Sequence, residues 1–135
     1  MTLRILDTSV LVQFWNRARG QSSADEIEAD SGQLAENLIA SQKTDAILTP
    51  VYLEFVAGSQ NEHELAAFRL FLARFRIVDN GRILPEDWKE ARRLAERVPR
   101  DGQRRHLGDC LIRAIAWRLK RDVITLDKRF PGSGR

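Results

Sequence analysis

The stretch AILTPVYLEFVAG, residues 46–58, joins a short β-type run directly to an apolar helical pattern. Thr49 and Pro50 are typical of a helix N-cap and a first helical position, so the helix begins where the strand ends. Glu54 lies inside this helix among apolar neighbours. Because a glutamate is almost never fully buried without a partner, Glu54 either reaches solvent or faces a group supplied by another part of the chain.

Short β-type runs and helical patterns alternate along the rest of the chain. The β-type runs are LRIL (3–6), AIL (46–48), RIV (76–78) and VIT (123–125). Apolar residues at helical spacing predict helices over about residues 33–43, 62–75, 86–98 and 108–121. Serine, glycine and charged residues are frequent in residues 17–32, which predicts a loop there.

Two of the predicted helices carry more local detail. Asn61 followed by Glu64 is a helix start signal. In residues 86–98 the apolar face consists of Trp88, Ala91, Leu94, Ala95 and Val98.

The alternation of strands and helices predicts the fold class. Strands separated by helices need crossover connections, which give a mainly parallel sheet covered on both faces. We therefore expect an α/β three-layer sandwich with a parallel sheet of four to five strands flanked by helices. The 135 residues suit a single domain spanning residues 1–135, and no linker interrupts them.

Composition excludes several classes of protein. With 43% apolar and 30% charged residues, the chain is typical of a globular protein rather than a disordered one. No apolar stretch approaches the roughly 20 residues of a membrane-spanning helix, so we expect no membrane association. The start of the chain lacks a small-residue cleavage site, and we expect a cytoplasmic protein. The single cysteine, Cys110, agrees with a reducing compartment.

Four acidic residues are expected at the carboxyl edge of the sheet. Asp7 follows the first strand, Asp127 comes two residues after the last, Glu54 lies one turn into the helix after the second, and Asp109 opens the helix before the last. In open α/β sheets, ligands bind outside this edge. Taken alone, Asp7 or Asp109 could be an N-cap and Asp127 part of a turn. Glu54 has no such explanation, because it lies inside a helix among apolar residues.

Together the four carboxylates call for a cation. Two like charges about 4 Å apart repel by roughly 4 kcal/mol at an effective dielectric constant near 20. Oxygen ligands without histidine or thiolate suit Mg²⁺ or Mn²⁺ rather than zinc. Such a site is typical of metal-assisted hydrolysis of phosphodiesters. Thr8, Ser9 and Thr125 place hydroxyls at the same edge, where they either position a phosphate or a water molecule or serve only capping and strand formation.

Positive charge is concentrated ahead of Asp109. The net charge of the chain is only +3, but six arginines lie between residues 92 and 105. Of these, Arg100, Arg104 and Arg105 are candidates for contacts with RNA phosphates, and a solvated face is the alternative.

Four motifs resemble the PIN domain, most closely the VapC-type toxins of bacterial toxin-antitoxin pairs. They are ILDTSVLV, VYLEFVAG, GDCLIRAIA and VITLDKRF, in that order along nearly the whole chain. The resemblance implies a Mg²⁺- or Mn²⁺-dependent endoribonuclease whose acids are Asp7, Glu54, Asp109 and Asp127. It also implies a homodimer, and a small antitoxin whose tail occupies the cleft. Cys110 stands where a small residue such as alanine is usual in the family, and Thr125 matches the family's hydroxyl position.

Other interpretations stay open from the sequence alone. The chain could be a catalytically silent PIN-like module that binds RNA or protein, or a phosphoacceptor domain of receiver type, although a lone Asp7 lacks the adjacent acid that a receiver needs. Cys110 with His106 could be a nucleophile and base, but a small buried thiol is the better interpretation. Phe14 and Trp15 belong either to the core or to a partner surface.

Overall fold

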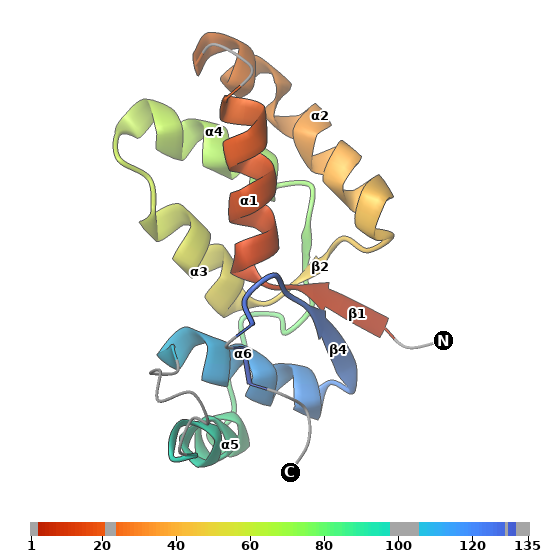
Figure 1. Ribbon diagram of the computed structural model, residues 1–135, viewed down its shortest axis with the longest axis vertical. Helices are drawn as coiled ribbons and strands as arrows, with labels where there is room; N and C mark the ends of the chain where they lie inside the picture. The colour runs from red at the N-terminus through yellow and green to blue at the C-terminus, as the bar shows by residue number, and fades with distance from the viewer. Residues whose placement is uncertain (1–2, 21–23, 98–105, 129, 132–135) are drawn as a thin grey trace.

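The computed structural model describes residues 3–20, 24–97, 106–128 and 130–131, with only the backbone for residues 24–28. Strands and helices alternate as expected (Figure 1). The described elements are β1 (Leu3–Leu6), α1 (Thr8–Arg19), α2 (Ala24–Gln42), β2 (Ala46–Ile47), α3 (Thr49–Ala57), α4 (Glu62–Leu72), β3 (Arg76–Ile77), α5 (Pro85–Ala95), α6 (Leu107–Arg118) and β4 (Arg121–Ile124).

The four described strands form two narrow parallel pairs. β1 pairs with β4, and β2 pairs with β3. β1 and β2 lie next to each other, and Thr44 Oγ1 donates a hydrogen bond to Arg4 O at 2.8 Å between them. The parallel α/β arrangement agrees with the expectation, but the sheet of four to five strands is present only as these two pairs. β2 and β3 have only two residues each, so they form too few hydrogen bonds to join the β1–β4 pair into one sheet.

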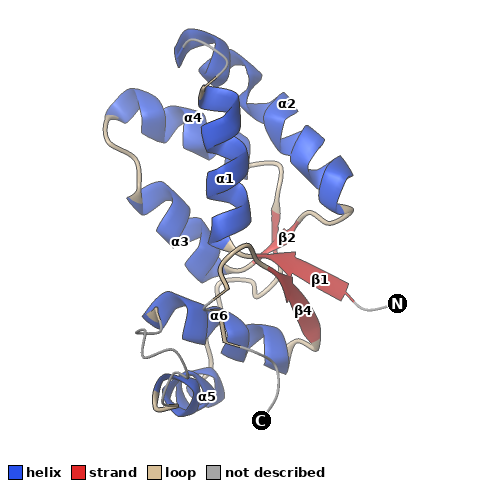
Figure 2. Ribbon diagram, in the orientation of Figure 1, coloured by secondary structure: helices blue, strands red, loops and turns tan. Residues whose placement is uncertain are grey.

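Helices cover both sides of the strands. Figure 2 shows α1 to α4 on one side and α5 and α6 on the other. No helix in the described part of the chain has the length and apolar character needed to cross a membrane.

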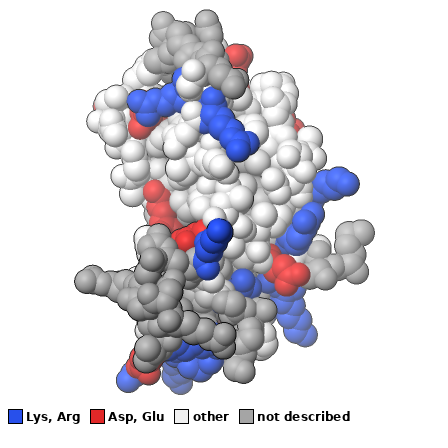
Figure 3. Space-filling model, viewed as in Figure 1, with Lys and Arg blue, Asp and Glu red and all other residues white. Residues whose placement is uncertain are grey.

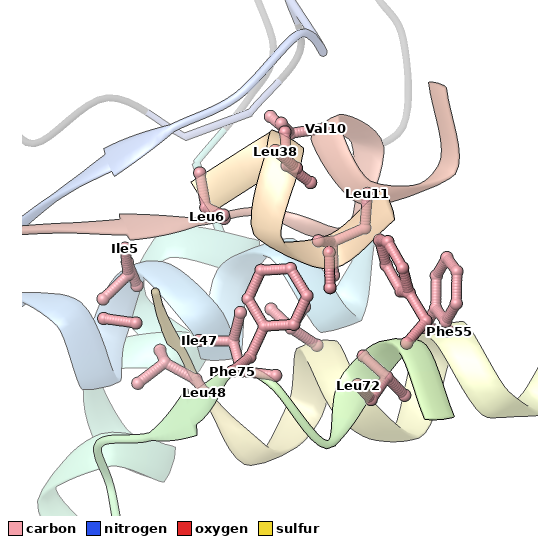
Figure 4. Close-up of a cluster of buried hydrophobic side chains, with 14 of the residues drawn as sticks. Ile5, Leu6, Val10, Leu11, Leu38, Ile47, Leu48, Phe55, Leu72 and Phe75 are labelled. Carbon is pink, nitrogen blue, oxygen red and sulfur yellow. The ribbon is translucent and has the colours of Figure 1, made fainter. Parts of the chain in front are cut away.

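The main core is built from the strands, the helices α1 to α4 and the inner face of α6 (Figure 4). Aromatic rings fill much of it: Trp15 packs edge-on against Phe68 and Phe71 with centroids 5.0 and 5.3 Å apart. Trp15 is only 4% exposed, and Phe14 packs against the same cluster. Both side chains therefore belong to the core rather than to a partner surface.

The prediction of a loop over residues 17–32 is wrong for residues 17–19 and 24–32, which are helical, and residues 21–23 lie outside the described residues. α1 continues to Arg19 and α2 begins at Ala24. Ser31 is fully buried, and a methyl group on Gly32 would lie 3.0 Å from the Arg74 guanidinium. Small residues here let the chain pack closely inside a helix, so their composition does not signal a turn.

Two local predictions also need correction. In α5 it is Asp87 that is buried, whereas Trp88 is 57% exposed. Asp87 accepts hydrogen bonds from Leu84 N at 2.9 Å and Arg118 Nε at 2.8 Å, and these bonds fix the buried face of the helix. At α3 the N-cap is Leu48 rather than Thr49.

Other local predictions are confirmed. Asn61 caps α4 through its side chain, which accepts a hydrogen bond from Glu64 N at 2.8 Å. Cys110 is buried against Ala91, Leu94 and Ala114, as expected for a small core thiol.

Candidate active site

Asp7 lies at the junction of β1 and α1 and is nearly buried, with 2% of its surface exposed. It occupies the N-cap position of α1, but its side chain makes no capping hydrogen bond. Instead, Asp7 Oδ2 accepts hydrogen bonds from Ser9 Oγ at 2.9 Å and Thr125 Oγ1 at 2.8 Å. These two hydroxyls, one from α1 and one from the segment after β4, fix the direction of the carboxylate.

The same hydroxyls tie the segment after β4 to Asp7. Ser9 Oγ accepts a hydrogen bond from Leu126 N, and Thr125 Oγ1 accepts one from Asp127 N, both at 3.0 Å. Asp7 N donates to Ile124 O at 2.9 Å. Asp127 is therefore fixed beside Asp7 although the two residues are far apart in sequence.

Glu54 is an exposed residue of α3 whose carboxylate reaches α1. Thr8 Oγ1 donates a hydrogen bond to Glu54 Oε1 at 2.7 Å. Burial of the carboxylate raises the pKa of Glu54, and the charge of Asp7 raises it further. The bond from Thr8 and the nearby His106 act in the opposite direction on this pKa. Thr8, Ser9 and Thr125 thus all hold carboxylates in place.

Asp109 lies in the first turn of α6 and is 7% exposed. Its pKa is raised to about 7, first by burial and then by the charges of Asp7, Glu54 and Asp127. A hydrogen bond with Asp127 adds to the shift, because it favours a protonated Asp109. The structure therefore brings the four sequence-predicted acids into one group, in which the charges of Asp7, Glu54 and Asp127 raise the pKa of Asp109.

No ion pair neutralises Asp7, Glu54 or Asp109 among the described residues. Figure 3 shows acidic side chains on the face where α1, α3 and α6 approach one another in Figure 1, with a Lys or Arg side chain beside them. The repulsion within the group is instead reduced by the raised pKa of Asp109.

The donor set fits a hard divalent cation. All four side chains offer carboxylate oxygens, the ligands that Mg²⁺ and Mn²⁺ prefer. Asp7 Oδ1 is buried and has no hydrogen-bond partner among the described residues, which leaves one oxygen of the group available. In the described part of the chain, however, no three His, Cys, Asp or Glu side chains stand close enough to hold a metal ion as they are. To hold an ion, the group would have to close by side-chain rotation, which for the exposed Glu54 means leaving its hydrogen bond from Thr8.

The arginine cluster ahead of Asp109 is described only in part. Arg100, Arg104 and Arg105 are outside the described residues. At the preceding end of the cluster, Arg92 pairs with Glu96 and Arg93 with Glu90 within α5, as on a solvated helix face.

Sequence reasoning missed two residues that surround the acids. A methyl group on Gly108 would lie 2.5 Å from Glu54 Oε2. Arg113, one turn after Asp109, donates through Nε to Pro131 O at 2.9 Å and lies over the Phe130 ring. Burial lowers the pKa of Arg113, and the charges of Asp122 and Asp7 oppose that shift. Only its helical spacing from Asp109 could have indicated Arg113.

Comparison with known proteins agrees with this arrangement. The model of the PIN domain family matches residues 4–132, which is nearly the whole chain. Neither the search of curated proteins nor the search of solved structures found a match.

Proposed function

Because the chain belongs to the PIN domain family, whose members are generally nucleases, we propose that it is a Mg²⁺- or Mn²⁺-dependent endoribonuclease. The observation that carries this proposal is the raised pKa of Asp109, caused in part by the charges of Asp7, Glu54 and Asp127. Carboxylates that repel one another in one place are the expected state of a site built for a divalent cation.

In such a site the acids and the hydroxyls would have different roles. Asp7, Glu54, Asp109 and Asp127 would hold the cation. Bound there, it would polarise an RNA phosphodiester and lower the pKa of a water molecule. Ser9 and Thr125 keep Asp7 in one orientation, and Thr8 does the same for Glu54.

The test is cleavage of single-stranded RNA by the purified chain. We expect cleavage with Mn²⁺ or Mg²⁺, none with chelator, and a loss of at least a hundredfold in Asp7→Asn and in Asp109→Asn. Asp30→Asn, an exposed aspartate of α2, is the matched control and should keep full activity. Asp109→Asn removes a charge from a repelling group, so its fold should be retained. Activity that survives both substitutions would refute these ligands.

A catalytically silent PIN-like module that binds RNA or protein is the alternative function. It predicts that RNA binds with the same affinity in chelator and in Mn²⁺ and stays intact in both. Asp7 Oδ1 has no hydrogen-bond partner among the described residues, and this argues against a silent module, which has no use for such a buried carboxylate oxygen.

We further propose that the chain is the toxin of a type II toxin-antitoxin pair, working as a cytoplasmic homodimer with a small antitoxin. The resemblance of its four motifs to VapC-type toxins supports this. Expression of the chain alone should then arrest growth, and Asp7→Asn should relieve the arrest. A small protein encoded beside it should restore growth and form a complex with it, and light scattering should give twice the mass of the chain.

Arg100, Arg104 and Arg105 are proposed contacts for RNA phosphates. Neutralising all three should weaken RNA binding in chelator and reduce the salt dependence of log K by about 0.7 per lost contact on a single strand. Arg92→Gln, which removes an exposed arginine paired with Glu96, is the control. An unchanged salt slope would assign the three arginines to a solvated face.

A further inference from the structure

A pocket of about 210 Å³ opens between α1 and the segment from α3 to α4. We call it the α1–α4 pocket. Glu54 is one of its lining residues, so the pocket borders the acid group directly. A strand of RNA whose phosphate lies at the acids would therefore pass its mouth.

The size of the α1–α4 pocket restricts what can enter. Pockets for drug-sized ligands and cofactors are typically about 300–1,000 Å³. The 210 Å³ here equals the volume of roughly seven water molecules at about 30 Å³ each. That space suits one heterocyclic base rather than a whole nucleotide or a stacked pair.

The lining has the composition of a base site. Trp15, Phe55 and Phe68 supply an apolar floor from the aromatic core. Asn16 from α1 and Gln60 from the α3–α4 loop supply exposed side-chain amides, each with donors and an acceptor. Neither amide has a hydrogen-bond partner among the residues that the structure describes. Proteins read single-stranded RNA by placing unstacked bases on apolar surfaces and bonding their edges in this way.

The mouth of the pocket is held in a fixed shape. Glu64 Oε1 accepts a hydrogen bond from Gln60 N at 3.1 Å, which anchors the loop that carries the Gln60 amide. Arg19 Nη1 lies 3.6 Å from Glu64 Oε2 on the other side. The backbone of Gln60 is thereby fixed at the mouth of the pocket, and its side-chain amide is left available to a base.

The charge of the pocket lining indicates which part of an RNA, a base or a phosphate, the pocket can bind. Glu54 and Glu64 line the pocket with a single cation, Arg19, which is paired with Glu64. This lining repels a phosphate and accepts an uncharged group with N–H donors.

We propose that the α1–α4 pocket binds one unstacked RNA base next to the cleaved phosphodiester and gives the enzyme its base preference. Asn16 and Gln60 are the residues that select the base. This inference rests on the proposed nuclease function, which it deepens by naming a substrate subsite.

The experiment uses the full chain and two readouts. In the first, a pool of single-stranded RNA with randomised sequence is cut in Mn²⁺ and the cut positions are sequenced. In the second, fluorescence anisotropy in EDTA measures binding of four homo-oligoribonucleotides, one for each base. The variants are Asn16→Ala and Gln60→Ala. The control is Gln13→Ala, an exposed amide on α1 outside the pocket lining.

If the pocket binds a base, the cut positions should show one preferred base beside the cleaved phosphodiester. The homo-oligoribonucleotide of that same base should bind most tightly in EDTA. Each amide variant should reduce that preference by about tenfold, the size of one lost base contact. Gln13→Ala should leave both readouts unchanged. A preference unaffected by both variants, or no preference at all, would overturn the pocket. The proposal would also be overturned if the amide variants kept their base preference but no longer formed a complex with a small partner protein. The pocket would then be a binding site for protein.

The two proposals fail in different ways. If the wild-type chain does not cut RNA in Mn²⁺, the nuclease function fails, and the EDTA readout still decides the pocket. If the chain cuts RNA but the amide variants keep its base preference, the pocket fails and the nuclease function stands.

Discussion

Gly108 leaves room for the Glu54 carboxylate at the start of α6. A methyl group at residue 108 would lie 2.5 Å from Glu54 Oε2 and 2.9 Å from Glu54 Cδ, closer than side chains approach without moving. The Glu54 carboxylate is at the far end of a flexible side chain. A methyl group at residue 108 would therefore displace the carboxylate and leave α6 in place. A glycine of one helix therefore sets the position of a proposed metal ligand on another.

Gly108→Ala should weaken metal binding without harming the fold. We expect the Kd for Mn²⁺, measured by calorimetry, to rise by about tenfold, as for other changes around metal ligands. The Tm of the metal-free chain should stay the same or rise, because alanine favours a helix over glycine by about 1 kcal/mol. Gly20→Ala is the control, since its methyl group meets only backbone oxygens at 3.6 Å. An unchanged Kd in Gly108→Ala would show that Glu54 does not bind the ion from this position.

Removal of the hydroxyls on Asp7 should loosen the same site. Thr125→Val keeps the shape of the side chain but deletes its bonds to Asp7 Oδ2 and from Asp127 N. We expect a tenfold to hundredfold rise in the Kd for Mn²⁺. Thr125→Ser, which restores the hydroxyl, should recover most of the affinity. If Ser and Val behave alike at residue 125, the hydroxyl has no part in metal binding.

The stability of the metal-free chain should fall as pH rises. The pKa of Asp109 is about 7 in the folded protein against 3.8 ordinarily, so between these values the folded state binds more protons than the unfolded state. Stability therefore decreases as pH rises from about 4 to 7. Tm measured in EDTA should be lower at pH 8 than at pH 5, and Asp109→Asn should reduce that difference. Asp30→Asn should keep the wild-type difference.

Mn²⁺ should reverse this trend. A metal ion binds the deprotonated carboxylates, so its affinity and the stabilisation that it gives increase with pH. We expect the rise in Tm on adding Mn²⁺ to be larger at pH 8 than at pH 5. An equal rise at both pH values would contradict a shared site for the ion and the Asp109 proton.

Asp79 should be important for stability because it anchors the start of α3. It is buried and accepts hydrogen bonds from Thr49 N at 2.9 Å, Thr49 Oγ1 at 2.6 Å and Gly81 N at 3.0 Å. Asp79→Ala should lower the free energy of unfolding in urea by about 3 kcal/mol, since bonds to a charged group contribute about 1.5–3 kcal/mol each. Thr49→Val should cost about half as much, and Asp30→Ala almost nothing. A small effect of Asp79→Ala would mean that α3 keeps its place without this anchor.

The sequence by itself determined the order of the strands and helices and the residues that flank the carboxyl ends of the strands. These features depend on short-range patterns: β-type runs, helical spacing, and the start signal at Asn61. Because parallel strands share one edge, Asp7 and Asp127 had to end up near each other, and the helices after β2 and before β4 add Glu54 and Asp109.

Tertiary structure alone decided which side chains those acids contact and which faces are buried. Asp87 replaces Trp88 in the buried face of α5 because its partner Arg118 comes from α6. The dense packing of Gly32 against Arg74 and the space at Gly108 depend on residues far away in sequence. No local pattern encodes such contacts, since they form only when separate helices meet.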